Sequence, residues 1–226
     1  MGLKERLESV LERIERSAKS VGRDPRKIKL VAVTKNFPAD IVREAHELGL
    51  KDFGENRAQE LKDKYESLKD LDITWHFIGR IQTNKVKHFV PIVEYVHSVW
   101  RIKELEEIDK RSKRIGKRIK VFVEVNVSGE ESKAGIRPNE VRDFIEKASD
   151  FESIEIVGLM TMAPYVEDPE KVRWIFRKLR ELRDELSKDF PSVKELSMGM
   201  SNDFEVAIQE GATFVRIGTA IFGERR

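Results

Sequence analysis

Short runs of β-branched and other apolar residues alternate along this chain with longer segments whose apolar positions recur every three or four residues. The first pattern is typical of buried strands and the second of amphipathic helices. The pattern predicts strands at 28–33, 51–54, 73–79, 93–99, 119–127, 154–162, 195–198 and 212–218. It predicts a leading helix at 3–21, and helices after successive strands at 39–48, 56–68, 83–89, 138–149, 169–187 and 202–210. The helix after the fourth strand is expected to end at 115.

Alternation of apolar strands with helices indicates a parallel sheet covered by helices, and eight such units in one chain favour closure into a barrel. We therefore expect an α/β fold, a single (β/α)8 barrel of the TIM type with an extra amino-terminal helix. Residues 1–226 show no linker or change of composition, so one domain is expected. A doubly wound open sheet is the alternative, because the strands at 51–54 and 195–198 are weak.

Composition narrows the class of protein but identifies no activity. The 226 residues carry a formal net charge of +2, which is too close to neutral to argue for nucleic acid or an anionic membrane as a partner. Cysteine is absent, so thiolate chemistry is excluded. The charged amino terminus has no apolar core of a secretory signal, and no stretch is apolar enough to span a bilayer, so a cytoplasmic location is expected.

In a β/α barrel the functional site lies at the carboxyl ends of the strands. Lys35 follows the first predicted strand directly. A lysine that points into the barrel mouth is partly desolvated, which lowers its pKa and lets the neutral amine attack a carbonyl to form a Schiff base. On position alone, the favoured interpretation is still a lysine whose ammonium reaches solvent, as most do in so lysine-rich a chain.

The turns after the last two predicted strands are rich in small and hydroxyl residues. Ser201 ends a Ser-Met-Gly-Met-Ser run, and Gly218-Thr219 follows the final strand. These loops often hold a phosphate in barrels, because glycine permits close approach to an anion. Ser201 could equally serve as an ordinary helix cap, and the two uses are compatible.

The remaining polar candidates carry weaker signals. The four histidines lack the spacing of metal ligands, so no metal site is predicted. His46 and His88 fall on helical segments and are expected at the surface, whereas His76 and His97 lie on strands and are expected as hydrogen-bonded core residues. Asn56, after the second strand, is either a hydrogen-bonding site residue or a loop former.

Taken together, the turn sequences resemble the YggS/PROSC family of pyridoxal 5'-phosphate (PLP) binding proteins, also called PLP homeostasis proteins. The resemblance extends over almost the whole chain, and all its segments occur in order. They are VAVTKNFPADIV (31–42), FGENRAQE (53–60), WHFIGRIQTNK (75–85), HSV (97–99), VNVSGEESKAG (125–135), GLMTMAP (158–164), LSMGMSNDFEVAI (196–208) and GATFVRIGTAIFG (211–223).

The resemblance implies a barrel like the amino-terminal domain of alanine racemase, with PLP held as a Schiff base on Lys35. It implies that Ser201, Gly218 and Thr219 contact the phosphate, that Arg216 lies near the pyridine nitrogen and that Asn56 lies near the cofactor face. An arginine there disfavours a protonated pyridine, because like charges repel. An unprotonated pyridine is a weaker electron sink, so the power of the cofactor to stabilise carbanions is muted.

Two functions follow from this resemblance. The first, which we favour, is a PLP carrier in intracellular PLP homeostasis with no catalytic residues, expected as a monomer whose partners are PLP and PLP-dependent apoenzymes. The alternative is an amino-acid racemase, which needs a proton donor on each cofactor face. Alanine racemases supply the second donor from a tyrosine in a following β domain; here only Tyr165 could reach the mouth. An unrelated phosphate-binding barrel enzyme would not explain the ordered segments.

Overall fold

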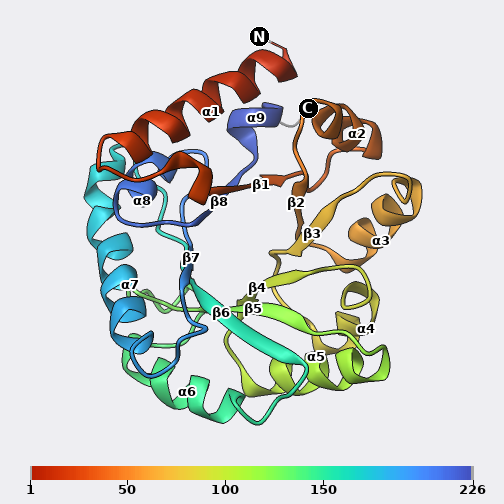
Figure 1. The fold of residues 1–226 in the computed structure, drawn as a ribbon, viewed down its shortest axis with the longest axis vertical. Helices are drawn as coiled ribbons and strands as arrows, with labels where there is room; N and C mark the ends of the chain where they lie inside the picture. The colour runs from red at the N-terminus through yellow and green to blue at the C-terminus, as the bar shows by residue number, and fades with distance from the viewer. Residues whose placement is uncertain (1, 225–226) are drawn as a thin grey trace.

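The computed structural model describes residues 2–224, which form a closed barrel of eight parallel strands surrounded by helices (Figure 1). The strands are β1 (Lys29–Val33), β2 (Asp52–Glu55), β3 (Thr74–Phe77), β4 (Tyr95–Val99), β5 (Ile119–Glu124), β6 (Ile154–Met160), β7 (Glu195–Ser197) and β8 (Phe214–Ile217). They pair in sequence order, and β8 pairs with β1 to close the ring. The predicted barrel is confirmed, and the open sheet is wrong.

Helices or helical turns follow every strand and form the outer layer in Figure 1. The α-helices are α1 (Leu3–Lys19), α2 (Ala39–Glu47), α3 (Ala58–Ser67), α4 (Val86–Phe89), α5 (Ile102–Arg114), α6 (Val141–Ala148), α7 (Arg173–Leu186), α8 (Phe204–Gln209) and α9 (Thr219–Phe222). The 3-10 turns are η1 (Pro25–Lys27), η2 (Thr83–Lys85), η3 (Pro138–Glu140) and η4 (Pro169–Val172). The predicted leading helix is α1, which packs against α8 and α9.

Strand geometry sorts the side chains into two layers, because successive residues point to opposite faces. Outward residues such as Leu196 and Val215 join the large apolar core between the barrel and its helices. A smaller cluster of Val31, Phe122, Val157, Met160 and Phe214 is separate from that core and fills the barrel interior. The interior is therefore a packed core, as expected for a barrel of this size.

The weak strands β2 and β7 are short, but each pairs with the strand on either side of it. Two glycines allow a neighbouring segment to approach each of these strands closely. A Cβ on Gly158 of β6 would lie 2.0 Å from the Glu195 carbonyl oxygen of β7, and one on Gly79 would lie 2.0 Å from the Asn56 carbonyl oxygen after β2. Larger residues at either position would push neighbouring segments apart, so these glycines help to close the barrel.

Candidate functional site

Lys35 lies just past the carboxyl end of β1, at the barrel mouth. Alternation along β1 puts Lys29, Val31 and Val33 on one face, and the same two-residue period, carried past the strand end, predicts the inward face for Lys35. The side chain of Lys35 is half-buried. Position on the inner face, with apolar residues below it, is what the chemistry of a reactive amine requires.

A buried polar cluster fixes the backbone just before Lys35. Thr34 points to the outer face, where its hydroxyl donates to Glu55 Oε1 at 2.6 Å. The Lys64 ammonium donates to the Thr34 carbonyl at 2.7 Å and to Glu55 Oε1 at 2.6 Å. Glu55 is fully buried, and burial raises its pKa although Lys64 and Thr34 oppose that shift. Removing Lys64 would leave this carboxyl buried without a countercharge.

The same cluster also fixes the backbone just after Lys35. Asn36 has a left-handed backbone with φ of 65°, and its N–H donates to the Glu60 carboxylate. Glu60 in turn accepts from Lys64 Nζ at 2.8 Å. Lys64 thus ties both neighbours of Lys35 to α3, so Lys35 stands on a segment held at both ends.

Arg216 of β8 is buried inside the barrel, on the same inward face as Phe214. Its Nη1 donates to Ser197 Oγ at 2.5 Å, and its Nη2 donates to the Thr161 carbonyl at 3.2 Å. Burial lowers the pKa of Arg216 to about 10, while nearby carboxyl groups act to raise it. The guanidinium is therefore still charged at neutral pH, and hydrogen bonds to β7 and to the residue after β6 fix its orientation.

Glu124 at the end of β5 is a buried carboxyl group that the sequence reasoning missed. It is 4% exposed, and burial raises its pKa to about 7, although the charge of Arg216 acts to lower it. The sequence signal for it is an acidic residue that directly follows the apolar run 121–123, in phase with the inward Phe122. This group changes its charge near neutral pH at the barrel mouth.

The turns after β7 and β8 lie side by side, as the phosphate hypothesis requires. The Ser201 hydroxyl accepts from the backbone N–H of Ala220 in α9 at 3.1 Å, which links the two turns. Thr219 is exposed, and Gly218 packs so closely that an added Cβ would lie 3.2 Å from the Val33 carbonyl oxygen. Ser201, Gly218 and Thr219 are therefore brought together beside the strand end that carries Lys35.

The capping role considered for Ser201 is not what the structure shows. The residue that precedes α8 is Asp203, whose side chain makes no capping bond to that helix. Its Oδ1 instead accepts from the Met200 N–H at 2.7 Å, which closes the turn. Gly199 in the same turn has φ of +99°, and a Cβ there would lie 2.7 Å from the Cβ of Ala207. Only glycine fits this position without strain.

Asn56 follows β2 at the same end of the barrel, and its Oδ1 is buried without a hydrogen-bond partner among residues 2–224. A buried acceptor of this kind is a place where a bound molecule would supply the missing donor.

His46 and His88 are at least partly exposed, whereas His76 and His97 are fully buried and hydrogen-bonded, as expected. Among residues 2–224, no group of three or more histidine, aspartate or glutamate side chains could hold a metal ion.

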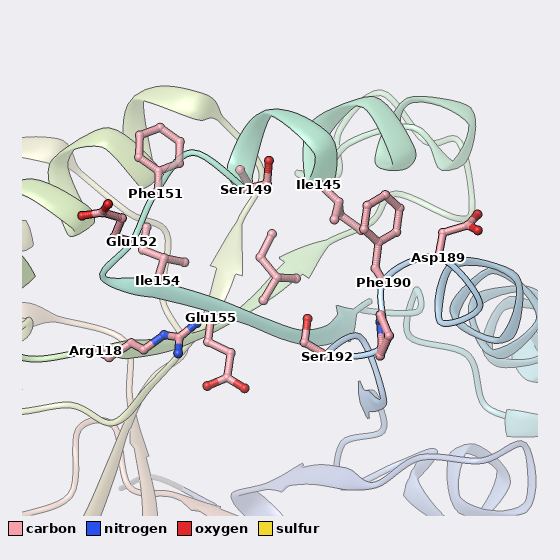
Figure 2. A pocket seen from close by; sticks show the side chains of 13 residues that line it. Arg118, Ile145, Ser149, Phe151, Glu152, Ile154, Glu155, Asp189, Phe190 and Ser192 are labelled. Carbon is pink, nitrogen blue, oxygen red and sulfur yellow. The ribbon is translucent and has the colours of Figure 1, made fainter.

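A cavity of about 380 Å³ lies at the opposite end of the barrel (Figure 2). Arg118, Ser149, Ile154 and Ser192 line it, where helices end and strands begin. It shares no residue with the predicted cofactor site.

Among the helices of residues 2–224, none combines the length and the apolar character needed to cross a membrane.

Comparison with known proteins defines the class of protein first. Residues 6–226 match the family profile described as "Alanine racemase, N-terminal domain". Alanine racemase of Clostridium difficile 630 superposes with a TM-score of 0.73 at 16% identity, over 95% of this chain and 56% of the racemase chain, which shows a shared fold. The barrel is thus of the alanine racemase amino-terminal class, as predicted.

Closer relatives define the family within that class. The chain is 50% identical over 223 residues to the pyridoxal phosphate homeostasis protein of Aquifex aeolicus (strain VF5), covering 98% of each chain. It is 41% identical to the human protein of that name over 229 residues, covering 93% of this chain and 83% of the human one. PipY of Synechococcus elongatus PCC7942, solved with PLP bound, matches with a TM-score of 0.87 and 36% identity over 98% of this chain and 100% of PipY. This chain belongs to the pyridoxal phosphate homeostasis protein family, which confirms the resemblance found in the sequence.

Proposed function

We propose that this protein binds PLP in intracellular PLP homeostasis and holds it as a Schiff base on Lys35. The observation that carries the proposal is the pairing of an inward, half-buried lysine with a buried arginine across one barrel mouth. Relatives named pyridoxal phosphate homeostasis proteins and the PLP-bound PipY structure support the choice of ligand. Condensation of Lys35 Nζ with the PLP aldehyde would form the C=N bond and release water.

The residues present fit the phosphate and the pyridine nitrogen of PLP, with an unpaired acceptor at the same end of the barrel. The joined turns of Ser201 and Gly218-Thr219 offer a hydroxyl and close backbone approach for the phosphate. The buried Oδ1 of Asn56 offers an unpaired acceptor at the same end of the barrel. Arg216 presents a fixed positive charge for the pyridine nitrogen, which keeps that nitrogen unprotonated.

PLP supplies an electron sink when it is bound, but the residues of this chain restrain that chemistry. A cation at Arg216 opposes protonation of the ring, so carbanions formed beside it would gain little stabilisation. Tyr165, the tyrosine considered as a second acid–base group, is 82% exposed in the loop after β6. We infer a carrier that gives PLP up to PLP-dependent apoenzymes, acting as a monomeric single-domain protein in the cytoplasm, rather than a racemase.

The proposal is tested by adding PLP to the purified apoprotein and following the visible absorbance. Wild type is expected to become yellow and to keep its colour through gel filtration. Lys35→Ala is expected to lose the bound band, and Lys27→Ala, which removes an exposed lysine at the opposite end of the barrel, is the matched control. Equal colour in wild type and Lys35→Ala would refute the Schiff base on Lys35.

A further inference from the structure

An unbroken chain of hydrogen bonds between side chains runs through the barrel interior from β2 to β8. Asp52 Oδ1 lies 2.8 Å from His76 Nε2, and His76 Nδ1 lies 2.9 Å from His97 Nε2. His97 Nδ1 lies 2.7 Å from Ser197 Oγ, which accepts from Arg216 Nη1 at 2.5 Å. We call these five residues the interior relay. It connects the amino-terminal end of the barrel with the arginine of the proposed PLP site.

Packing holds the relay rigidly. The ring of His76 stacks on Tyr95 with centroids 4.7 Å apart and planes 5° apart. The ring of His97 stacks on Phe122 at 4.5 Å and 21°. Both histidines are fully buried, so their rings cannot exchange these bonds for bonds to water. At the far end, Lys29 Nζ lies 3.2 Å from Asp52 Oδ1.

The two ends of the relay determine the direction in which every proton is donated. Arg216 has only donors, so Ser197 Oγ accepts from it, which leaves the hydroxyl proton of Ser197 for His97 Nδ1. A neutral His97 then carries its proton on Nε2 and donates it to His76 Nδ1. His76 carries its proton on Nε2 and donates to the Asp52 carboxylate. The opposite direction would turn the bare lone pair of His76 Nε2 toward a carboxylate.

The charge states agree with this direction. Burial alone would raise the pKa of Asp52, but the hydrogen bond and charge interaction with His76, together with the charge of Lys29, outweigh it and lower the pKa. Burial lowers the pKa of His76 although Asp52 acts to raise it, and burial lowers that of His97 well below its usual value, so both rings are neutral at pH 7. The relay thus joins a cation to an anion through neutral groups that each donate once, an arrangement in which successive bonds polarise and strengthen one another.

We propose that His97 and His76 are positioning residues, which act through Ser197 to fix the guanidinium of Arg216 against the pyridine ring of PLP. This role rests on the proposed function, because PLP is the group that Arg216 would face. Within residues 2–224, the other hydrogen bond of the Arg216 guanidinium is longer and goes to the backbone carbonyl of Thr161. Without the relay, the guanidinium could turn about that single bond.

The relay itself is tested on the apoprotein, independently of PLP. Long-range 1H–15N spectra of protein labelled in its four histidines would report the tautomer of each ring, with assignment from His76→Gln and His97→Gln. The relay requires both rings to be neutral at pH 7 with the proton on Nε2. A ring protonated on Nδ1, or a charged ring, at either position would overturn the inference.

The positioning role is tested by the absorbance and dissociation constant of bound PLP. Ser197→Ala is expected to weaken PLP binding about tenfold, the usual effect of losing one charge-assisted hydrogen bond. Asp52→Asn, which keeps the acceptor oxygen and removes only the charge, is expected to displace the absorbance maximum with a smaller loss of affinity. Tyr95→Phe keeps the stacking on His76 and is the matched control, with no displacement expected.

The outcomes separate the two proposals. If wild type binds PLP and both Ser197→Ala and Asp52→Asn keep its spectrum and affinity, the positioning role is wrong while the proposed function stands. If wild type binds no PLP, the proposed function and the positioning role both fail, and the histidine tautomers still decide whether the relay exists.

Discussion

Replacing Glu124 with glutamine should stabilise the PLP-free protein at alkaline pH and have no such effect in acid. Glu124 is 4% exposed at the end of β5. Burial raises its pKa from 4.5 to about 7, and the attraction of Arg216 offsets only part of that cost. Glutamine has nearly the same shape and cannot ionise, so this substitution isolates the free energy of holding a carboxylate inside the barrel.

The magnitude follows from linkage between protonation and folding. A pKa that rises from 4.5 in the unfolded chain to about 7 in the folded protein corresponds to about 3 kcal/mol, at roughly 1.4 kcal/mol per unit. Because the folded-state pKa is the higher one, folding favours the protonated carboxyl. The contribution of Glu124 to stability is therefore fully present below pH 4.5 and is lost as the pH rises through about 7.

The assay is urea unfolding of wild type and Glu124→Gln at several pH values from 4.5 to 8.5, followed by circular dichroism and tryptophan fluorescence. The difference in free energy of unfolding between the two proteins is expected to change by about 3 kcal/mol in favour of the variant across this range. Glu131→Gln, an exposed glutamate in the loop after β5, is the control and should give a constant difference. A constant difference for Glu124→Gln would refute the reasoning.

Three further substitutions test the contacts of the site. Lys64→Met should lower the free energy of unfolding by about 3–5 kcal/mol, measured by urea unfolding, because Glu55 would remain buried without its countercharge; an effect below 1 kcal/mol would contradict this. Gly199→Ala should cost about 1–3 kcal/mol and weaken PLP binding, measured by fluorescence titration, since the position needs a positive φ and an added Cβ meets Ala207; unchanged stability and affinity would show that the turn relaxes freely. Arg216→Glu should change the absorbance of bound PLP, because a carboxylate favours a protonated pyridine nitrogen; an identical spectrum in a variant that still binds PLP would place Arg216 away from the ring.

Most of the fold could be predicted from the sequence, because local patterns of apolar and polar residues determine it. Alternating strands and helices predict the barrel, and the two weak strands are β2 and β7, which are only four and three residues long. The position of Lys35 at the carboxyl end of β1 follows from the strand pattern alone. In the same way, Ser201, Gly218 and Thr219 meet because the turns after adjacent parallel strands must lie at the same end of the barrel.

Properties that depend on contacts between distant strands could not be predicted. His76 and His97 were expected to be hydrogen-bonded core residues, but their partners, Asp52 and Ser197, follow from the register of four strands, which residue spacing does not specify. The pKa of Glu124 depends on how much water the closed barrel excludes. Such quantities are set by tertiary packing, so only the structure could supply them.

Peptide mapping after borohydride reduction tests the central claim most directly. PLP-loaded protein would be reduced, digested and analysed by mass spectrometry, since reduction turns a C=N bond into a stable amine. The account predicts one phosphopyridoxyl group per chain, on the peptide that contains Lys35. Modification concentrated on any other lysine, or no modification in protein that has bound PLP, would contradict it.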